Sequence, residues 1–81
     1  MARKEINMPR FGAAMKQGEI ISWEVEVGDH VDQDDVLCEV QAEKMATEVE
    51  SLYAGTIAEI VAEEGETCDV GAVLAYIDTD E

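Results

Sequence analysis

The stretch "GEIISWEVEVGDHVDQDDVLCEV", residues 18–40, decides the fold because the chain repeats it. A shift of 37 residues overlays this stretch on "GTIAEIVAEEGETCDVGAVLAYI", residues 55–77. The two copies share two glycines and a Val-Leu pair at matching positions, and positions of these kinds fix turns and core. The sequence therefore predicts two units of one design, related by a pseudo-twofold axis and burying one shared face.

Each copy contains, in order, a strand, a turn of glycine and an acidic residue, a short strand, a polar loop and a further strand. In the first copy Ile21, Trp23, Val25 and Val27 alternate with polar residues, which is the period-two pattern of a half-buried strand. The second copy also fits a helical period over residues 56–64, but equivalent positions of a repeat share a conformation. The pattern predicts an all-β fold, a small sandwich or flattened barrel, with Trp23 at least partly buried.

Length and charge limit the classes of function. The 81 residues predict one domain, and a hydrophobic content of 47% is too high for a disordered acidic tail. A net charge of −15 argues against binding to nucleic acids or anionic membranes and favours partners with basic docking patches. No apolar run approaches the roughly 20 residues that span a bilayer, and the N-terminal residues lack the apolar segment of a signal peptide.

The two cysteines, Cys38 and Cys68, are too few for a disulfide scaffold and lack the spacing of a redox or zinc motif. We expect both to be packed free thiols, Cys68 because it occupies the place that Val31 has in the first copy. This usage fits a reducing compartment, the cytoplasm, or the mitochondrial matrix in a eukaryote.

Lys44 is the most unusual residue of the sequence. From residue 17 onward the chain has 19 carboxylates and only this one Lys or Arg. A strand ends at Val40 and the next begins near Thr47, where a third alternation starts, so Lys44 is predicted in a hairpin turn. The pseudo-twofold puts that turn at one end of the domain and both termini at the other. A single exposed amine beside Glu43 is a poor phosphate site, but it suits an enzyme that modifies one lysine.

Other functional patterns are weak. The chain has no Ser–His–Asp set, its single histidine, His30, is expected on the surface, and "DHVDQDD" lacks the Gly and Glu of a calcium loop. "ESL", residues 50–52, resembles the phosphopantetheine site of acyl carrier proteins, with Ser51 as the attachment residue, but that fold is helical. An unmodified β module used only for docking is a second alternative.

The chain resembles a lipoyl domain of a 2-oxo acid dehydrogenase complex acyltransferase, within the biotinyl and lipoyl attachment family. The matching segments are "MPRFGAAMKQGEIISWEVEVGDHV" (8–31), "VQAEKMATEVES" (40–51) and "AGTIAEIVAEEGETCDVGAVLAYI" (54–77). The resemblance implies a flattened barrel of two four-stranded antiparallel sheets. It also implies a single domain over residues 1–81, as the N-terminal module of a longer acyltransferase chain, with a lipoyl group in amide linkage to Lys44.

The same resemblance implies a carrier rather than an enzyme. The lipoyl group on Lys44 would take an acyl group from a thiamine-diphosphate decarboxylase that acts on a 2-oxo acid or acetoin. It would deliver that group to coenzyme A at the acyltransferase core and be reoxidised by dihydrolipoamide dehydrogenase. A lipoate ligase or transferase is a further implied partner, and the isolated domain is expected to be monomeric.

The hairpin sequence leaves a second cofactor open. Lipoyl domains usually have Thr-Asp-Lys-Ala and biotinyl domains Ala-Met-Lys-Met, whereas this chain has Ala42-Glu43-Lys44-Met45. Glu43 is the lipoyl-like flank and Met45 the biotin-like flank, and both are expected to be read by the modifying enzyme. The N-terminal segment and Trp23 favour lipoate, so a biotin carboxyl carrier domain with biotin on Lys44 is the alternative.

Overall fold

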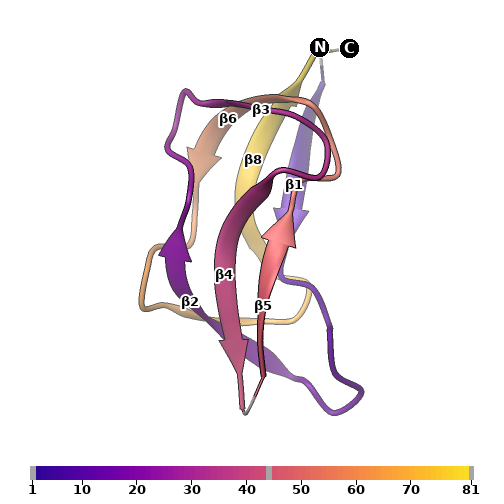
Figure 1. The fold of residues 1–81 in the computed structure, drawn as a ribbon, viewed down its shortest axis with the longest axis vertical. Coiled ribbons are helices and arrows are strands. Elements are labelled where there is room, and N and C mark those ends of the chain that lie inside the picture. Colours follow the sequence, from indigo (N-terminus) through magenta and orange to yellow (C-terminus); the bar gives the residue numbers. More distant parts are fainter. Residues whose placement is uncertain (1, 44, 81) are drawn as a thin grey trace.

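The computed structural model describes residues 2–43 and 45–80. In this part of the chain, eight strands form two four-stranded antiparallel sheets that pack face to face (Figure 1). One sheet has the order β1-β8-β6-β3 and the other β5-β4-β2-β7. The all-β prediction is confirmed. The strands are β1 (Arg3–Asn7), β2 (Gln17–Trp23), β3 (His30–Val31), β4 (Val36–Ala42), β5 (Met45–Glu50), β6 (Gly55–Ile60), β7 (Thr67–Asp69) and β8 (Val73–Thr79).

The internal repeat is confirmed strand by strand. Exchanging β1–β4 for β5–β8 converts the strand order of one sheet into that of the other. The turns match as well: Gly28 and Gly65 have φ angles of 96° and 88°, in the left-handed region that glycine adopts at little cost. Gly28 N–H donates to the carbonyl of Ile57 at 2.8 Å, and Gly65 N–H donates to that of Ile20 at 2.7 Å. Each half therefore pins its own turn to a strand of the other half.

The predicted buried face of the first strand was partly wrong. Ile20 is fully buried, whereas Ile21 is 39% exposed and Val27 is 58% exposed. Trp23 and Val25 do pack against the core, as expected. Strand β2 ends at Trp23, and the residues after it form a turn rather than continuing the strand.

A β-bulge explains this correction. Across the sheet Ile20 faces Val40 and Trp23 faces Cys38, so Ile21 is an extra residue in β2. A bulge of this kind moves every later side chain to the opposite face. The same irregularity recurs 37 residues later in β6. The bulge returns Trp23 to the core side, where its indole N–H donates a hydrogen bond of 2.7 Å to a backbone carbonyl.

The core lies between the two sheets and is closed by a few loop residues. Cys38 is fully buried and burial raises the pKa of its thiol to about 12, as expected for an inert packed cysteine. Cys68 is only half-buried, because β7 is a short edge strand, so the expectation of a packed thiol holds less well there. The buried apolar side chains are Ile6, Met8, Met15, Ile20, Val31, Leu37, Cys38, Val40, Ala42, Val49, Ile57, Ala62, Leu74, Ala75 and Ile77.

The β4–β5 hairpin and the two ends of the chain lie at opposite ends of the molecule, which measures 36 × 21 × 17 Å (Figure 1). The two ends are joined because Thr79 N–H donates to the carbonyl of Ala2 at 2.7 Å. Both hairpin strands are longer than predicted, since β4 runs to Ala42 and β5 starts at Met45. The described residues contain no helix of the length and apolarity that crossing a membrane requires.

Candidate functional site

The hairpin turn leaves two residues between paired strands. Ala42 faces Met45 across the β4–β5 ladder, and Glu43 directly follows Ala42. Two-residue hairpins of the type I′ form need positive φ at their central residues, and Glu43 has a φ of 53°. Glu43 and Met45 are both exposed, Met45 at 53%. The structure therefore presents both predicted recognition flanks, while the predicted attachment residue, Lys44, lies outside the described residues.

The loop of residues 8–16, between β1 and β2, lies beside this hairpin. It is anchored by two nearly buried side chains, Met8 and Met15. Met15 N–H donates to the carbonyl of Gly12 at 3.0 Å, and Phe11 N–H donates to the Met15 sulfur at 3.5 Å. At its end, the carbonyl of Lys16 accepts a bond of 3.0 Å from a backbone N–H just after β7. The loop is thus held at both ends and by a bond within it.

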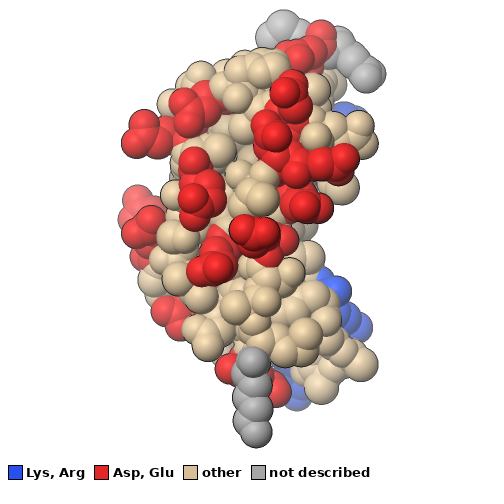
Figure 2. All heavy atoms as spheres, in the orientation of Figure 1, with Lys and Arg blue, Asp and Glu red and all other residues tan. Residues whose placement is uncertain are grey.

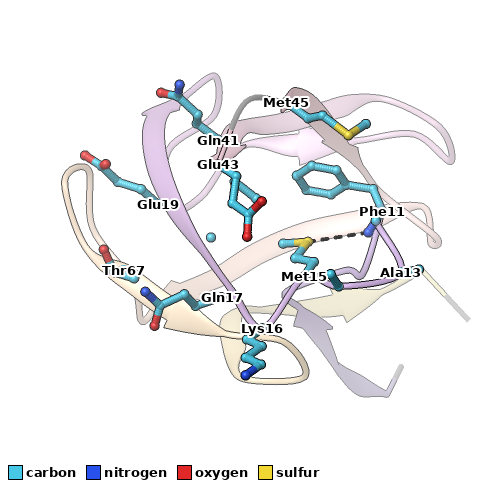
Figure 3. A pocket seen from close by; sticks show the side chains of 14 residues that line it. Phe11, Ala13, Met15, Lys16, Gln17, Glu19, Gln41, Glu43, Met45 and Thr67 are labelled. Atoms are coloured by element: carbon cyan, nitrogen blue, oxygen red, sulfur yellow. Dashed lines mark hydrogen bonds between the residues drawn. The ribbon is translucent and has the colours of Figure 1, made fainter.

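A groove, here called the hairpin groove, separates loop and hairpin (Figure 3). Phe11, Met15 and Met45 contribute apolar surface, and the Glu43 carboxylate lies over the middle of the opening (Figure 3). Lys16 is the basic residue among the described lining residues. The full lining consists of Phe11, Gly12, Ala13, Ala14, Met15, Lys16, Gln17, Gly18, Glu19, Gln41, Ala42, Glu43, Met45 and Thr67.

Sequence reasoning missed this groove. Residues 8–16 show no local pattern that places them beside the hairpin. The available signal was a pair of methionines, Met8 and Met15, at either end of a short connection that also holds Pro9 and Gly12. Two apolar anchors flanking two turn-forming residues indicate a loop folded back on the core.

Charge is distributed unevenly over the surface. Acidic side chains cover much of the visible face above the hairpin end, which is largely uncharged in this view, with basic side chains at its margin (Figure 2). The outer face of the second sheet even places Glu39 directly opposite Glu48, a like-charge pair that disfavours folding. On this face the hairpin end therefore carries fewer acidic side chains than the surface above it (Figure 2).

The other residues considered from sequence lie elsewhere. His30 is exposed on β3, near the chain ends, and its imidazole contacts the Asp80 carboxylate at 3.0 Å, which raises the pKa of His30. Ser51 is fully buried, and its hydroxyl donates to the carbonyl of Tyr53, so it cannot serve as an exposed attachment site. Within residues 2–43 and 45–80, no cluster of three or more His, Cys, Asp or Glu could hold a metal ion.

Comparison with known proteins gives a family for this arrangement. The family model described as "Biotin-requiring enzyme", the biotin/lipoyl attachment family, matches residues 4–77. The chain belongs to this family. A solved lipoyl domain, from the 2-oxoglutarate dehydrogenase complex of Azotobacter vinelandii, covers 95% of this chain and is itself covered to 98%, with a TM-score of 0.77 and 28% identity. The resemblance to lipoyl domains and the expected pair of four-stranded sheets are both confirmed.

Curated relatives of the chain are acyltransferase components. The acetyltransferase of the Corynebacterium glutamicum pyruvate dehydrogenase complex is 46% identical over 94% of this chain. The lipoamide acyltransferase of the Bacillus subtilis branched-chain alpha-keto acid dehydrogenase complex is 40% identical over 99%. The chain spans only 11% and 19% of these two relatives. Urea carboxylase from Kluyveromyces lactis shares the fold, with a TM-score of 0.79 over 96% of this chain and 6% of that one, but only 20% identity.

Proposed function

We propose that this domain is the mobile carrier of a 2-oxo acid dehydrogenase complex, with a lipoyl group in amide linkage to Lys44. The observation that carries the proposal is the tight β4–β5 hairpin, which holds exposed Glu43 and Met45 at the end of the domain farthest from its termini. A modifying enzyme and several active sites can approach that end without meeting the chain that leaves the domain. The 40–46% identity to acyltransferase components supports lipoate as the group.

The chain's own residues position and present the group. The ladder pairing of Ala42 with Met45 fixes the reversal, and the left-handed Glu43 gives the turn a defined shape. When bound, a lipoyl group supplies a disulfide that can be reduced, acylated and reoxidised. The acidic surface favours encounter with basic rims on the thiamine-diphosphate decarboxylase, the dihydrolipoamide dehydrogenase and the acyltransferase core, and tethering raises the local concentration of the carrier.

A biotin carboxyl carrier domain is the second candidate. Ala42 and Met45 match the biotin-type flanks, and the family contains both kinds of domain. The fold alone does not separate the two, because one family model covers both kinds of domain. The relatives of higher identity favour lipoate. Glu43 is the flanking residue that departs from the biotin-type sequence, so we expect the choice of cofactor to depend on it.

The test is intact mass after coexpression with a lipoate ligase and a biotin ligase, in the presence of both cofactors. We expect a lipoyl adduct on the unaltered chain and none on Lys44→Arg. Lys16→Arg, the matched change beside the hairpin groove, keeps the adduct. An adduct that persists on Lys44→Arg contradicts the assigned residue, and biotin alone on the unaltered chain contradicts the assigned cofactor.

Glu43→Met completes the biotin-type sequence and tests the flank directly. We expect this variant to gain biotin and lose lipoate in competition between the two ligases. Glu48→Met removes a carboxylate from the exposed side of the same hairpin and serves as its control. Equal modification of the two variants would show that Glu43 is not read by the ligases.

A further inference from the structure

We propose that the hairpin groove is the resting site of the domain's own lipoyl group, with the dithiolane packed against Phe11, Met15 and Met45. This inference rests on the proposed function, because it requires lipoate on residue 44. It adds a binding site on the carrier itself, made by the loop of residues 8–16. The group then alternates between a docked position on the domain and an extended position that reaches partner active sites.

The first support is the path from the attachment point. Glu43 and Met45, the immediate neighbours of residue 44, both line the groove, so its mouth begins at the modified turn. A group attached there is held next to the groove by a covalent tether. Even weak contacts are then populated, because tethering gives the group a high effective concentration.

The second support is the chemistry of the lining. The Phe11 ring and the thioethers of Met15 and Met45 lie along one side of the groove (Figure 3). Methionine is soft and adaptable, and sulfur makes favourable contacts with aromatic rings. The lipoyl group offers an apolar chain that ends in two sulfur atoms, which matches this surface. Polar side chains of Gln17, Gln41 and other residues complete the remaining walls.

The third support is an exposed apolar side chain. Met45 is 53% exposed, next to a partly buried Phe11, in a protein whose surface is otherwise rich in carboxylates. Apolar area left in water disfavours the free domain, and covering it with the attached chain recovers that free energy. The equivalent connection in the other half, residues 51–54, is only four residues long and does not line the hairpin groove.

The direct experiment compares unmodified, octanoylated and lipoylated forms of this chain by NMR, each verified by intact mass, with methyl-labelled methionines. We expect nuclear Overhauser contacts from the lipoyl methylenes to the Phe11 ring and the Met15 methyl. We also expect amide shifts that extend into residues 11–18. Shifts confined to residues 42–46, without those contacts, overturn the proposal. Absence of any lipoyl adduct contradicts the proposed function instead, so the two failures are distinguishable.

A second readout is the rate at which dithiothreitol, a neutral reductant, reduces the attached dithiolane. We expect dithiothreitol to reduce the dithiolane on the Phe11→Ala variant about two- to tenfold faster than the dithiolane on the unaltered domain. This range is the one expected from the loss of a sulfur–aromatic contact. Leu52→Ala, which shortens an exposed side chain away from the groove, keeps the original rate. Equal rates in all three proteins overturn the proposal. Met45→Gln alters an exposed position and provides the same test if Phe11→Ala does not fold.

Discussion

The connection from β1 to β2 and its counterpart from β5 to β6 start in the same way and end with different roles. Met8 exchanges backbone hydrogen bonds with residues 71 and 72, and Ser51 does so with residues 34 and 35. The first connection then continues for nine residues, 8–16, and the second for four, 51–54. Only the longer one reaches the hairpin and lines the groove. The repeat thus produces the two matching sheets, and the longer connection in one half produces the hairpin groove.

The largest expected difference between the halves concerns a matched pair of buried glycines. A Cβ on Gly55 would meet backbone atoms, the Asp78 carbonyl oxygen and Thr79 Cα at 2.8 Å, which cannot move independently. A Cβ on Gly18 would meet only side-chain atoms, among them a methyl of Val40 at 2.7 Å. We expect Gly55→Ala to lower the free energy of unfolding by about 3–4 kcal/mol and Gly18→Ala by about 1–2 kcal/mol. Urea denaturation measures both, and equal losses contradict the expectation.

Trp23 and its counterpart Ile60 give the next largest difference. Both follow a bulge and pack partly against the core, but the Trp23 indole also donates a hydrogen bond to the carbonyl of Ala62. We expect Trp23→Ala to cost about 3 kcal/mol and Ile60→Ala about 2 kcal/mol. Trp23→Phe keeps a ring and loses the bond, at a cost of about 1 kcal/mol. Thermal melting separates the variants, and a melting curve of Trp23→Ala that overlays the unaltered protein refutes the packing.

A smaller difference concerns the turns before β4 and β8. Asp34, with a φ of 76°, occupies the place that Gly71, with a φ of 91°, has in the other half. No atom lies within 4 Å of a Cβ built on Gly71, so only backbone strain opposes a side chain there. We expect Gly71→Ala to cost about 1 kcal/mol, and Asp34→Gly to raise stability by less than that. If Asp34→Gly lowers stability as much as Gly71→Ala, strain is not the controlling factor.

The smallest expected difference depends on pH. The pKa of His30 is raised, chiefly by the hydrogen bond with Asp80 and further by Asp32 and Asp35, whereas its counterpart Thr67 does not titrate. A raised pKa in the folded state stabilises the fold below about pH 6.5, and that contribution is lost as the pH rises past the raised value. Because the pair is exposed, we expect a small drop in melting temperature from about pH 5.5 to pH 8. We expect this drop to shrink in His30→Thr, and an identical drop in both proteins contradicts the prediction.

Most of the strands and turns could be predicted from the sequence, because each copy of the repeat supports the assignment made for the other. Gly28 and Gly65 marked matching turns, and the clear strand pattern of the first copy decided the segment of the second copy that also fitted a helix. The bulge at Ile21 was not predicted, because Ile21 is itself apolar and alternates with Trp23, so the sequence does not show that Ile20 is the residue facing the core.

The candidate site was predictable only at the hairpin. The isolated cation and its flanks, Glu43 and Met45, are local features of the sequence. The groove beside them could not be predicted from neighbouring residues. It depends on the positions that Met8 and Met15 take in the core, which only the folded structure shows. The geometry of Lys44 lies outside the described residues, so its role stays a prediction.

The pairing of β1 with β8 has a consequence for how the protein is made. Arg3, near the beginning of the chain, lies opposite Asp78, near its end, and the two side chains form an ion pair. On the ribosome β1 has no neighbour in its sheet until β8 has been synthesised. Such long-range pairing delays folding until almost the whole domain has emerged. Until then β1 is a bare strand, and the charges of Arg3, Lys4 and Glu5 help to keep it from joining other chains.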